Sequence, residues 1–249
     1  MDETALPRAI PLEGGSNLRD LGGWPAAGGR RVRAGCVFRA ATLARLTVAD
    51  VARLAALGLR TVCDLRGEHE AARAPSRLPP EVERIALPIE PTVGASLRDL
   101  LAREASTGED VVLLLRRAYL DYGTTWLPHY RRVIALAAEP ARQALLFHCS
   151  AGKDRTGFGA ALLLLALGAE REVLLADYVA TERLWARDYA LPAGTPAPLA
   201  EALYAAHPAL LEEALDAAIA PYGTERDFLE YGLGLDARGL AALREALLE

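Results

Sequence analysis

The stretch from His148 to Gly157, which reads HCSAGKDRTG, constrains the fold of this chain more than any other segment. It follows the apolar run 144–147 and precedes a second apolar run that begins at Phe158. This order predicts a strand, a tight loop and a helix. A loop that leads into a helix N-terminus directs its backbone N–H groups toward one point, and an anion binds there.

Two side chains give this predicted loop its chemistry. Cys149 stands at the start of the loop, and Arg155 follows six residues later. The positive field of the helix terminus favours the thiolate form of a cysteine, and a guanidinium binds two phosphate oxygens at once. We therefore expect a phosphatase-type site in which Cys149 attacks phosphorus and forms a thiophosphate intermediate. Thr156 is expected to donate its hydroxyl to the sulfur.

The remaining loop residues are expected to bind the phosphate group or to support the loop. Lys153 is the only lysine in the chain, and its compact ammonium fits beside Arg155 where a second planar guanidinium would be crowded. His148 is expected to point away from the pocket and to orient the loop through backbone contacts. The residues expected to contact phosphate are Ser150, Ala151, Gly152, Lys153 and Thr156.

Two aspartates are candidates for the general acid that protonates the leaving oxygen. Asp154 adjoins the site, but Lys153, Arg155 and the loop amides favour its carboxylate form, so an acid role there implies an acidic optimum or a substrate that favours protonation. Asp64 ends a predicted strand and is placed to face the same pocket, or else to pair with Arg66 as a structural carboxylate. Asp154 is the first choice, and the alternative stays open.

Other interpretations of the loop fit less well. A nucleotide-binding loop requires a glycine five residues before Gly152 and Ser or Thr after Lys153, and Phe147 and Asp154 occupy those positions. An isolated Cys and Arg at this spacing would be a weak signal, but the flanking histidine, glycines and threonine after a predicted strand make it a specific one.

Composition limits the partners and the compartment. The 249 residues suffice for a single α/β domain, and the net charge of −5 argues against nucleic-acid or anionic-membrane binding. The three cysteines show no disulfide or zinc pattern, so no metal is expected, and Cys36 and Cys63 are expected in the core. The N-terminus lacks a signal peptide, and the longest uncharged run, 156–169, is shorter than a membrane span. We expect a cytoplasmic protein without an integral membrane segment, although signal-less secretion would leave no trace.

The apolar periodicity predicts alternating strands and helices along the chain. The segment 14–23 is expected to be a loop, and Asp177 and Tyr178, like the charged run 170–172, are expected on a helix surface. Strands are predicted at 31–39, 59–65, 81–89 and 144–149. Helices are predicted at 47–57, 95–138 with a break at Pro128, 157–168, 171–187, 198–220 with a break near Pro208, and 236–248.

These motifs resemble the loop of cysteine-dependent protein tyrosine phosphatases, and in particular a bacterial branch with Lys-Asp before the arginine. The resemblance covers most of the chain. Asn17 to Gly23, NLRDLGG, is similar to the NFRDLGG signature of that branch, and Phe38 to Ala40 is similar to its FRS element. Further segments in family order are Leu46-Thr47…Asp50, Asp64-Leu65-Arg66…Glu70, Asp177-Tyr178 and Tyr222-Gly223…Leu229…Gly232-Leu233.

The resemblance implies a single phosphatase domain over 1–249, with a four- or five-stranded, mostly parallel central sheet flanked by helices. It implies no cofactor and no metal. It also implies activity on phosphotyrosine and often on phosphoserine, phosphothreonine or phosphoinositides, with the loop lysine contacting extra phosphates. Relatives carry a helical lid, for which 92–139 is the candidate segment here.

Two other functions remain as alternatives. A catalytically weak phospho-ligand-binding module would use the same cradle, although such a module needs Arg155 and not the thiol of Cys149. A thiol redox enzyme or sulfurtransferase would use Cys149, but it has no need of the arginine six residues later.

Overall fold

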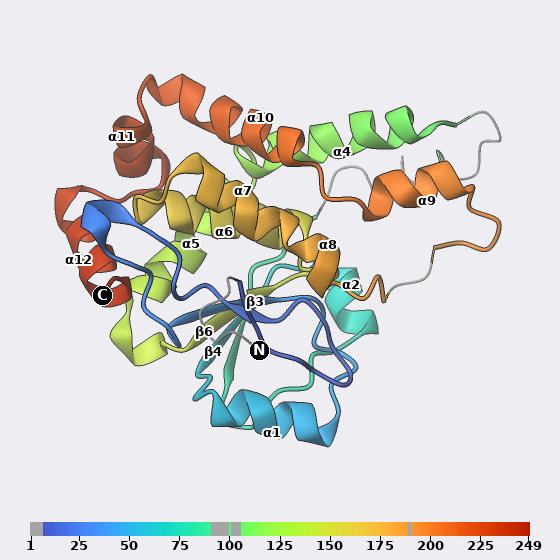
Figure 1. The fold of residues 1–249 in the computed structure, drawn as a ribbon, viewed down its shortest axis with the longest axis horizontal. Coiled ribbons are helices and arrows are strands. Elements are labelled where there is room, and N and C mark those ends of the chain that lie inside the picture. Colours follow the sequence, from blue (N-terminus) through green and yellow to red (C-terminus); the bar gives the residue numbers. More distant parts are fainter. Residues whose placement is uncertain (1–6, 91–99, 101–105, 189–190) are drawn as a thin grey trace.

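A six-stranded sheet in the order β1-β2-β3-β6-β4-β5 forms the centre of the computed structural model, which describes residues 7–90, 100, 106–188 and 191–249 (Figure 1). The strands β3, β6, β4 and β5 are parallel to one another, and β1 and β2 add an antiparallel edge. The predicted α/β class with a mostly parallel sheet is confirmed. The strand count exceeds the predicted four or five because two short strands, β1 and β2, were not predicted; β2 forms within the segment 14–23, which was expected to be a loop. The strands are β1 Arg8–Ala9, β2 Arg19–Asp20, β3 Val37–Ala40, β4 Thr61–Asp64, β5 Glu83–Ala86 and β6 Leu145–His148.

Side chains of the central strands alternate between two apolar layers, because successive residues of a strand point to opposite faces. Phe38, Val62 and Leu146 pack on one face. Cys63 and Phe147 pack on the other face, in a larger cluster. The helix α1 covers the smaller layer, while most other helices lie on the opposite side of the sheet (Figure 1). Cys36 and Cys63 are buried, as predicted.

The predicted helices are present in order and most have shorter bounds, but α6 begins at Asp154 and not at 157, and the short helices α2 and α11 were not predicted. Helix α1 begins at the capping residue Thr47, whose side chain accepts a hydrogen bond from the Asp50 amide. The described part of the segment 95–138 includes α4 and α5, and Pro128 lies in the first turn of α5, where proline is tolerated. The helices are α1 Val48–Ala56, α2 Glu68–Arg73, α4 Gly108–Tyr122, α5 Leu127–Ala138, α6 Asp154–Ala166, α7 Arg171–Val179, α8 Thr181–Leu184, α9 Ala197–Tyr204, α10 Pro208–Ile219, α11 Glu225–Asp227 and α12 Ala237–Leu247. Short 3₁₀ turns at Ala27–Gly29, Pro140–Arg142 and Ala220–Tyr222 and a π-helical turn at Phe228–Gly232 complete the set.

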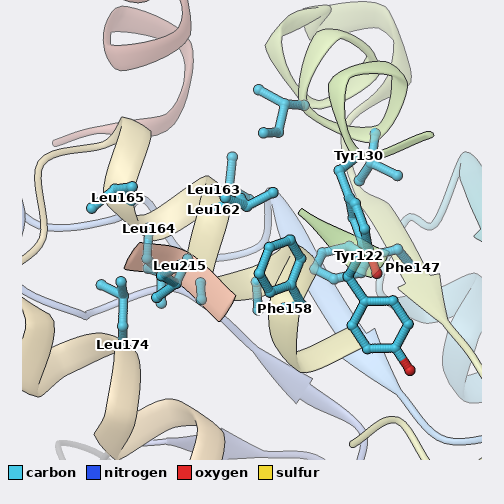
Figure 2. Close-up of a cluster of buried hydrophobic side chains, with 14 of the residues drawn as sticks. Tyr122, Tyr130, Phe147, Phe158, Leu162, Leu163, Leu164, Leu165, Leu174 and Leu215 are labelled. Carbon is cyan, nitrogen blue, oxygen red and sulfur yellow. The ribbon is translucent and has the colours of Figure 1, made fainter. Parts of the chain in front are cut away.

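Helix α6 is the central helix of the larger layer, and every one of its residues after Asp154 is buried. Its Phe158 ring packs against Tyr122 and Tyr130, with ring centroids 5.9 and 5.2 Å away. Figure 2 shows these three rings together beside Phe147 of β6. Burial on all sides holds the N-terminal end of α6 in one place against the sheet, which fixes the loop that precedes it.

The candidate lid segment, 92–139, lies partly outside the described residues, since 91–99 and 101–105 are not described. Its described part forms α4 and α5. Helix α5 packs into the core through Tyr130, Val133 and Ile134, so this part of the segment belongs to the domain itself. The lid stays a prediction.

Candidate active site

The predicted loop between β6 and α6 is present but ends earlier than expected, and its conformation requires glycine at one point. Strand β6 ends at His148, and α6 begins at Asp154. Gly152 has a φ of +65°, and a Cβ atom there would lie 2.3 Å from the carbonyl oxygen of Ala40 in β3. Both the left-handed backbone and the close approach exclude a side chain. Cys149, which is 2% exposed, is the first residue of this loop.

The outer side of the loop is held by hydrogen bonds to its carbonyl groups. The Nδ2 of Asn17 donates to the Ala151 and Gly152 carbonyls over 2.9 and 3.1 Å, and the Arg39 guanidinium donates to the Gly152 carbonyl over 2.7 Å. No acceptor in the described part of the chain binds the amides of Ser150, Ala151 or Gly152. The loop thus turns its carbonyls outward and leaves its N–H groups for an anion, as a phosphate cradle requires.

Arg39, which binds the loop, also belongs to a buried network of ion pairs. Asp177 of α7 accepts hydrogen bonds from Arg19, over 2.9 Å, and from Arg39, and all three side chains are at most 1% exposed. Burial alone would raise the pKa of Asp177, but the two guanidiniums hold the pKa below its ordinary value. The predicted surface position of Asp177 and Tyr178 is therefore wrong, since both side chains are buried. Arg19 and Arg39, from strands far from α7 in the sequence, pair with Asp177 on this face of the helix.

Arg155 is oriented by a carboxylate that the sequence analysis gave no role. Glu70 of α2 binds the Arg155 guanidinium with both oxygens, over 2.5 and 3.0 Å, and accepts a hydrogen bond from the Ser150 hydroxyl over 2.6 Å. The Arg155 guanidinium also donates to the carbonyls of Leu65 and Ile89. This fork-to-fork pair fixes the plane of the guanidinium beside the loop.

The charge of Glu70 is stabilised by the same contacts. Burial would raise the pKa of Glu70, but the hydrogen bonds and charge of Arg155 and the hydroxyl of Ser150 lower it to about 2. The sequence signal was slight, because Glu70 is one of several charged residues in the short helix α2. Only its place in the Asp64-Leu65-Arg66…Glu70 motif marked it.

His148 is fully buried and contacts the back of the loop. Its Nδ1 lies 3.1 Å from the Cys149 carbonyl oxygen, and its Nε2 lies 3.4 Å from the Ser76 hydroxyl and 3.7 Å from Asp64 Oδ1. Burial lowers the pKa of His148 to about 4, despite the opposing charge of Asp64, so the ring is neutral near pH 7. These are contacts to backbone and structural groups, as expected of a residue that orients the loop.

Asp64, the second candidate for the general acid, lies between two arginines. Arg66 donates to both of its oxygens, over 2.9 and 2.8 Å, and Arg84 donates to Oδ2 over 2.9 Å. The side chain is buried, which alone would raise its pKa, but Arg66, His148 and Arg84 hold the pKa far below the ordinary value. Of the two interpretations of Asp64, this geometry favours the structural carboxylate paired with Arg66.

Asp154, the first choice for the acid, opens α6 and keeps partial access to solvent, with a side chain 22% exposed. Its Oδ1 accepts a hydrogen bond of 2.8 Å from the hydroxyl of Tyr119, on α4. No hydrogen bond to Oδ2 is made by any residue that the structure describes. Asp154 therefore has one oxygen held by the protein and one left for another partner.

Lys153 does not extend into the cradle in this structure. Its ammonium donates to the carbonyls of Leu203 and Ala205, over 2.6 and 2.7 Å, and lies 5.8 Å from the centre of the Trp185 ring. The side chain is 2% exposed and its Nζ is 3.6 Å from Asp154 Oδ1. The end of α9 supplies two acceptors for the ammonium, and the predicted phosphate contact of Lys153 stays a prediction.

The predicted hydrogen bond from Thr156 to the cysteine sulfur is also not made. The Thr156 hydroxyl is buried and has no hydrogen-bond partner among the described residues. A hydroxyl left without a partner beside the loop retains its capacity to donate. Within the same described residues, no group of three or more His, Cys, Asp or Glu side chains is arranged to hold a metal ion.

Comparison with known proteins identifies the family. A model of the tyrosine phosphatase family matches residues 10–249. The chain is 39% identical over 168 residues to a protein of Cupriavidus necator named "Putative tyrosine-protein phosphatase", a match that covers 66% of this chain and 59% of that protein. It is 34% identical over 193 residues to the triple specificity protein phosphatase PtpB of Mycobacterium tuberculosis, covering 68% and 67% of the two chains. A match that spans the strand, the cysteine loop and the helices around it, from residue 10 to the last residue, shows that this chain belongs to the tyrosine phosphatase family.

Proposed function

We propose that this protein is a cysteine-dependent phosphatase that hydrolyses phosphomonoesters through a thiophosphate intermediate. The observation that carries the proposal is the cradle around Cys149, whose amides at Ser150, Ala151 and Gly152 are bound by no described residue and whose Arg155 is fixed by Glu70. The amides and the guanidinium would bind the phosphoryl oxygens, and this binding strengthens as negative charge develops there in the transition state.

In the first step, the Cys149 thiolate forms the S–P bond while the bond from phosphorus to the leaving oxygen breaks. Asp154 gives its proton to that oxygen, which leaves as an alcohol or phenol. In the second step, water attacks phosphorus and transfers a proton to the Asp154 carboxylate, so that the S–P bond breaks and phosphate and thiolate are released. The free hydroxyl of Thr156 would stabilise the thiolate as it leaves.

For the substrates, we propose phosphotyrosine, with phosphoserine, phosphothreonine and phosphoinositides as further candidates. The triple specificity named for the mycobacterial relative supports a range beyond phosphotyrosine. A contact between Lys153 and an extra phosphate would require its ammonium to leave the Leu203 and Ala205 carbonyls. Phosphoinositide activity would therefore need a rearrangement at the end of α9.

We place the enzyme in the cytoplasm, with a phosphorylated protein or lipid headgroup as partner. All three cysteines are unpaired, as is usual in a reducing compartment. Among the described helices, none combines the length and the apolar character that crossing a bilayer would take.

The test is phosphate release from a phosphotyrosine peptide, a phosphoserine peptide and phosphoinositide vesicles, by the wild type, Cys149→Ser and Cys63→Ser. Cys63 is the matched control, because burial raises the pKa of its thiol to about 12 and keeps it a thiol. We expect Cys149→Ser to lose all turnover and Cys63→Ser to retain it per folded molecule.

Two outcomes would contradict the proposal. Turnover retained by Cys149→Ser would exclude the cysteine mechanism. Tight binding without turnover by the wild type on every substrate would instead identify a phospho-ligand-binding module.

A further inference from the structure

A chain of hydrogen bonds leads from the α9–α10 junction to Asp154. The hydroxyl of Tyr119 lies 2.8 Å from Asp154 Oδ1 and 2.5 Å from the hydroxyl of Tyr178, and the amide of His207 lies 3.0 Å from the Tyr178 hydroxyl. Tyr119 and Tyr178 are 1% and 0% exposed. The chain is thus shielded from water up to the carboxylate where it ends.

The direction of each hydrogen bond follows from the chemistry of the groups. The His207 amide can only donate, so Tyr178 accepts from it. An ionised carboxylate can only accept, so Tyr119 gives its single proton to Asp154 Oδ1. Tyr178 must then donate to Tyr119. Every proton in the chain points toward Asp154.

Both phenols stay neutral, which preserves this order. Burial, together with the charge of Asp154, raises the pKa of Tyr119 and of Tyr178 well above the ordinary value. A phenol that cannot ionise remains a donor to Oδ1 whether Asp154 is ionised or protonated. The hydroxyl oxygen of a carboxyl group is a poorer acceptor than its carbonyl oxygen, so the donor at Oδ1 favours protonation of the other oxygen.

We propose that Tyr119, supported by Tyr178, is a positioning residue that holds Oδ1 of Asp154 as an acceptor and so directs the acidic proton to Oδ2, the oxygen to which no described residue donates. This inference rests on the proposed role of Asp154 as the general acid. Tyr119 itself exchanges no proton with the substrate. It fixes the rotation of the carboxyl group and the oxygen that carries the proton.

The experiment compares kcat/KM for phenyl phosphate, whose leaving group needs a proton, with kcat/KM for p-nitrophenyl phosphate, whose leaving group needs one far less. General acid catalysis contributes about 10²–10⁴-fold, and we expect Tyr119→Phe to lose roughly tenfold with phenyl phosphate and little with p-nitrophenyl phosphate. Tyr178→Phe, which leaves the Tyr119 donor in place, is expected to give a smaller loss of the same kind. In Asp154→Asn, adding Tyr119→Phe should cause no further loss.

Tyr130→Phe is the matched control, since it removes another buried tyrosine hydroxyl, one that donates to the Arg155 carbonyl. It should leave the ratio of the two substrates unchanged. Equal losses on both substrates in Tyr119→Phe and Tyr178→Phe, or a full additional loss in the double variant, would overturn the inference and mark the tyrosines as packing residues. An unchanged ratio in Asp154→Asn would overturn the assignment of the acid itself.

Discussion

Asp64 and Asp154 lie at the ends of two elements that meet at the cysteine loop, β4 and α6, but their surroundings differ. Asp64 is buried between the guanidiniums of Arg66 and Arg84, which bind both of its oxygens. Asp154 binds one neutral phenol through Oδ1 and keeps a partly exposed side chain. Both oxygens of Asp64 are thus taken by guanidiniums, whereas Asp154 has one oxygen to which no described residue donates. The comparison teaches that two carboxylates beside one loop can differ in how many of their oxygens remain open to another partner.

The largest expected effect is the loss of activity when Asp154, and not Asp64, is replaced by asparagine. Asp154→Asn keeps the shape of the side chain and removes the transferable proton. We expect kcat/KM for phenyl phosphate to fall by about 10²–10⁴-fold. The urea midpoint of unfolding should change little, because the side chain is partly exposed. A large loss of stability with normal turnover would reverse the roles of the two residues.

Asp64→Asn should act on stability instead. Removing one partner of a buried ion pair leaves Arg66 uncompensated, and this typically costs about 3–5 kcal/mol. We expect a fall of that size in the free energy of unfolding, measured by urea titration. The ratio of phenyl to p-nitrophenyl phosphate activity should stay that of the wild type, and a collapse of this ratio would restore Asp64 as an acid.

Gly157→Ala sharpens the comparison because it disturbs the tyrosine pair that supports Asp154 and not the arginines that bind Asp64. A Cβ at Gly157 would lie 2.7 Å from the ring of Tyr178, so the ring would have to move. Overpacking of this kind costs about 1–3 kcal/mol, which urea unfolding would detect. We expect a selective loss with phenyl phosphate as well, because Tyr178 supports Tyr119. Unchanged unfolding and turnover would show that the ring adjusts freely.

The smallest effect is on the pH dependence of stability. Burial lowers the pKa of His148 from 6.5 to about 4, so the unfolded chain takes up a proton first and stability falls as the pH drops from 6.5 toward 4. Glu70, despite its burial, has a pKa lowered from 4.5 to about 2 by Arg155, so the stability it contributes above pH 4.5 is lost as the pH falls toward 2.

Glu70→Gln should remove the loss of stability below pH 4.5 and leave the loss between pH 6.5 and 4, which comes from His148. Urea unfolding at a series of pH values measures both ranges. The same slope below pH 4.5 in the variant and the wild type would show that Glu70 does not contribute.

Local patterns were sufficient to predict the sheet class and the order of strand, loop and helix around Cys149, because the apolar runs and the glycine of the loop lie within a few residues of one another. The start of α6 was predicted at 157, whereas the helix begins at Asp154. The contacts around the loop are not local. Asp177 lies in a helix with charged residues nearby, and this pattern predicts a surface position. It is buried because it pairs with Arg19 of β2 and Arg39 of β3. Such pairings depend on the completed fold.

Tyr119 illustrates a further limit. In α4 the buried positions include Val111, Leu115 and Tyr119, spaced four residues apart along the same stripe of the helix. That spacing predicts a core position, and Tyr119 is indeed buried. Its hydroxyl reaches Asp154 because α4 and α6 pack together, which nothing in the spacing of either helix reveals.

The lysine of the loop gives this protein a built-in spectroscopic label. Because Lys153 is the only lysine in the sequence, lysine supplied with ¹⁵N or ¹³C during expression would produce a single side-chain NMR signal. In this structure that ammonium is enclosed by Leu203, Ala205 and the Trp185 ring. The ring would displace the signal from its free-lysine position. Following that one resonance during titration with a phosphorylated ligand would report whether the end of α9 releases the ammonium, without any engineered probe.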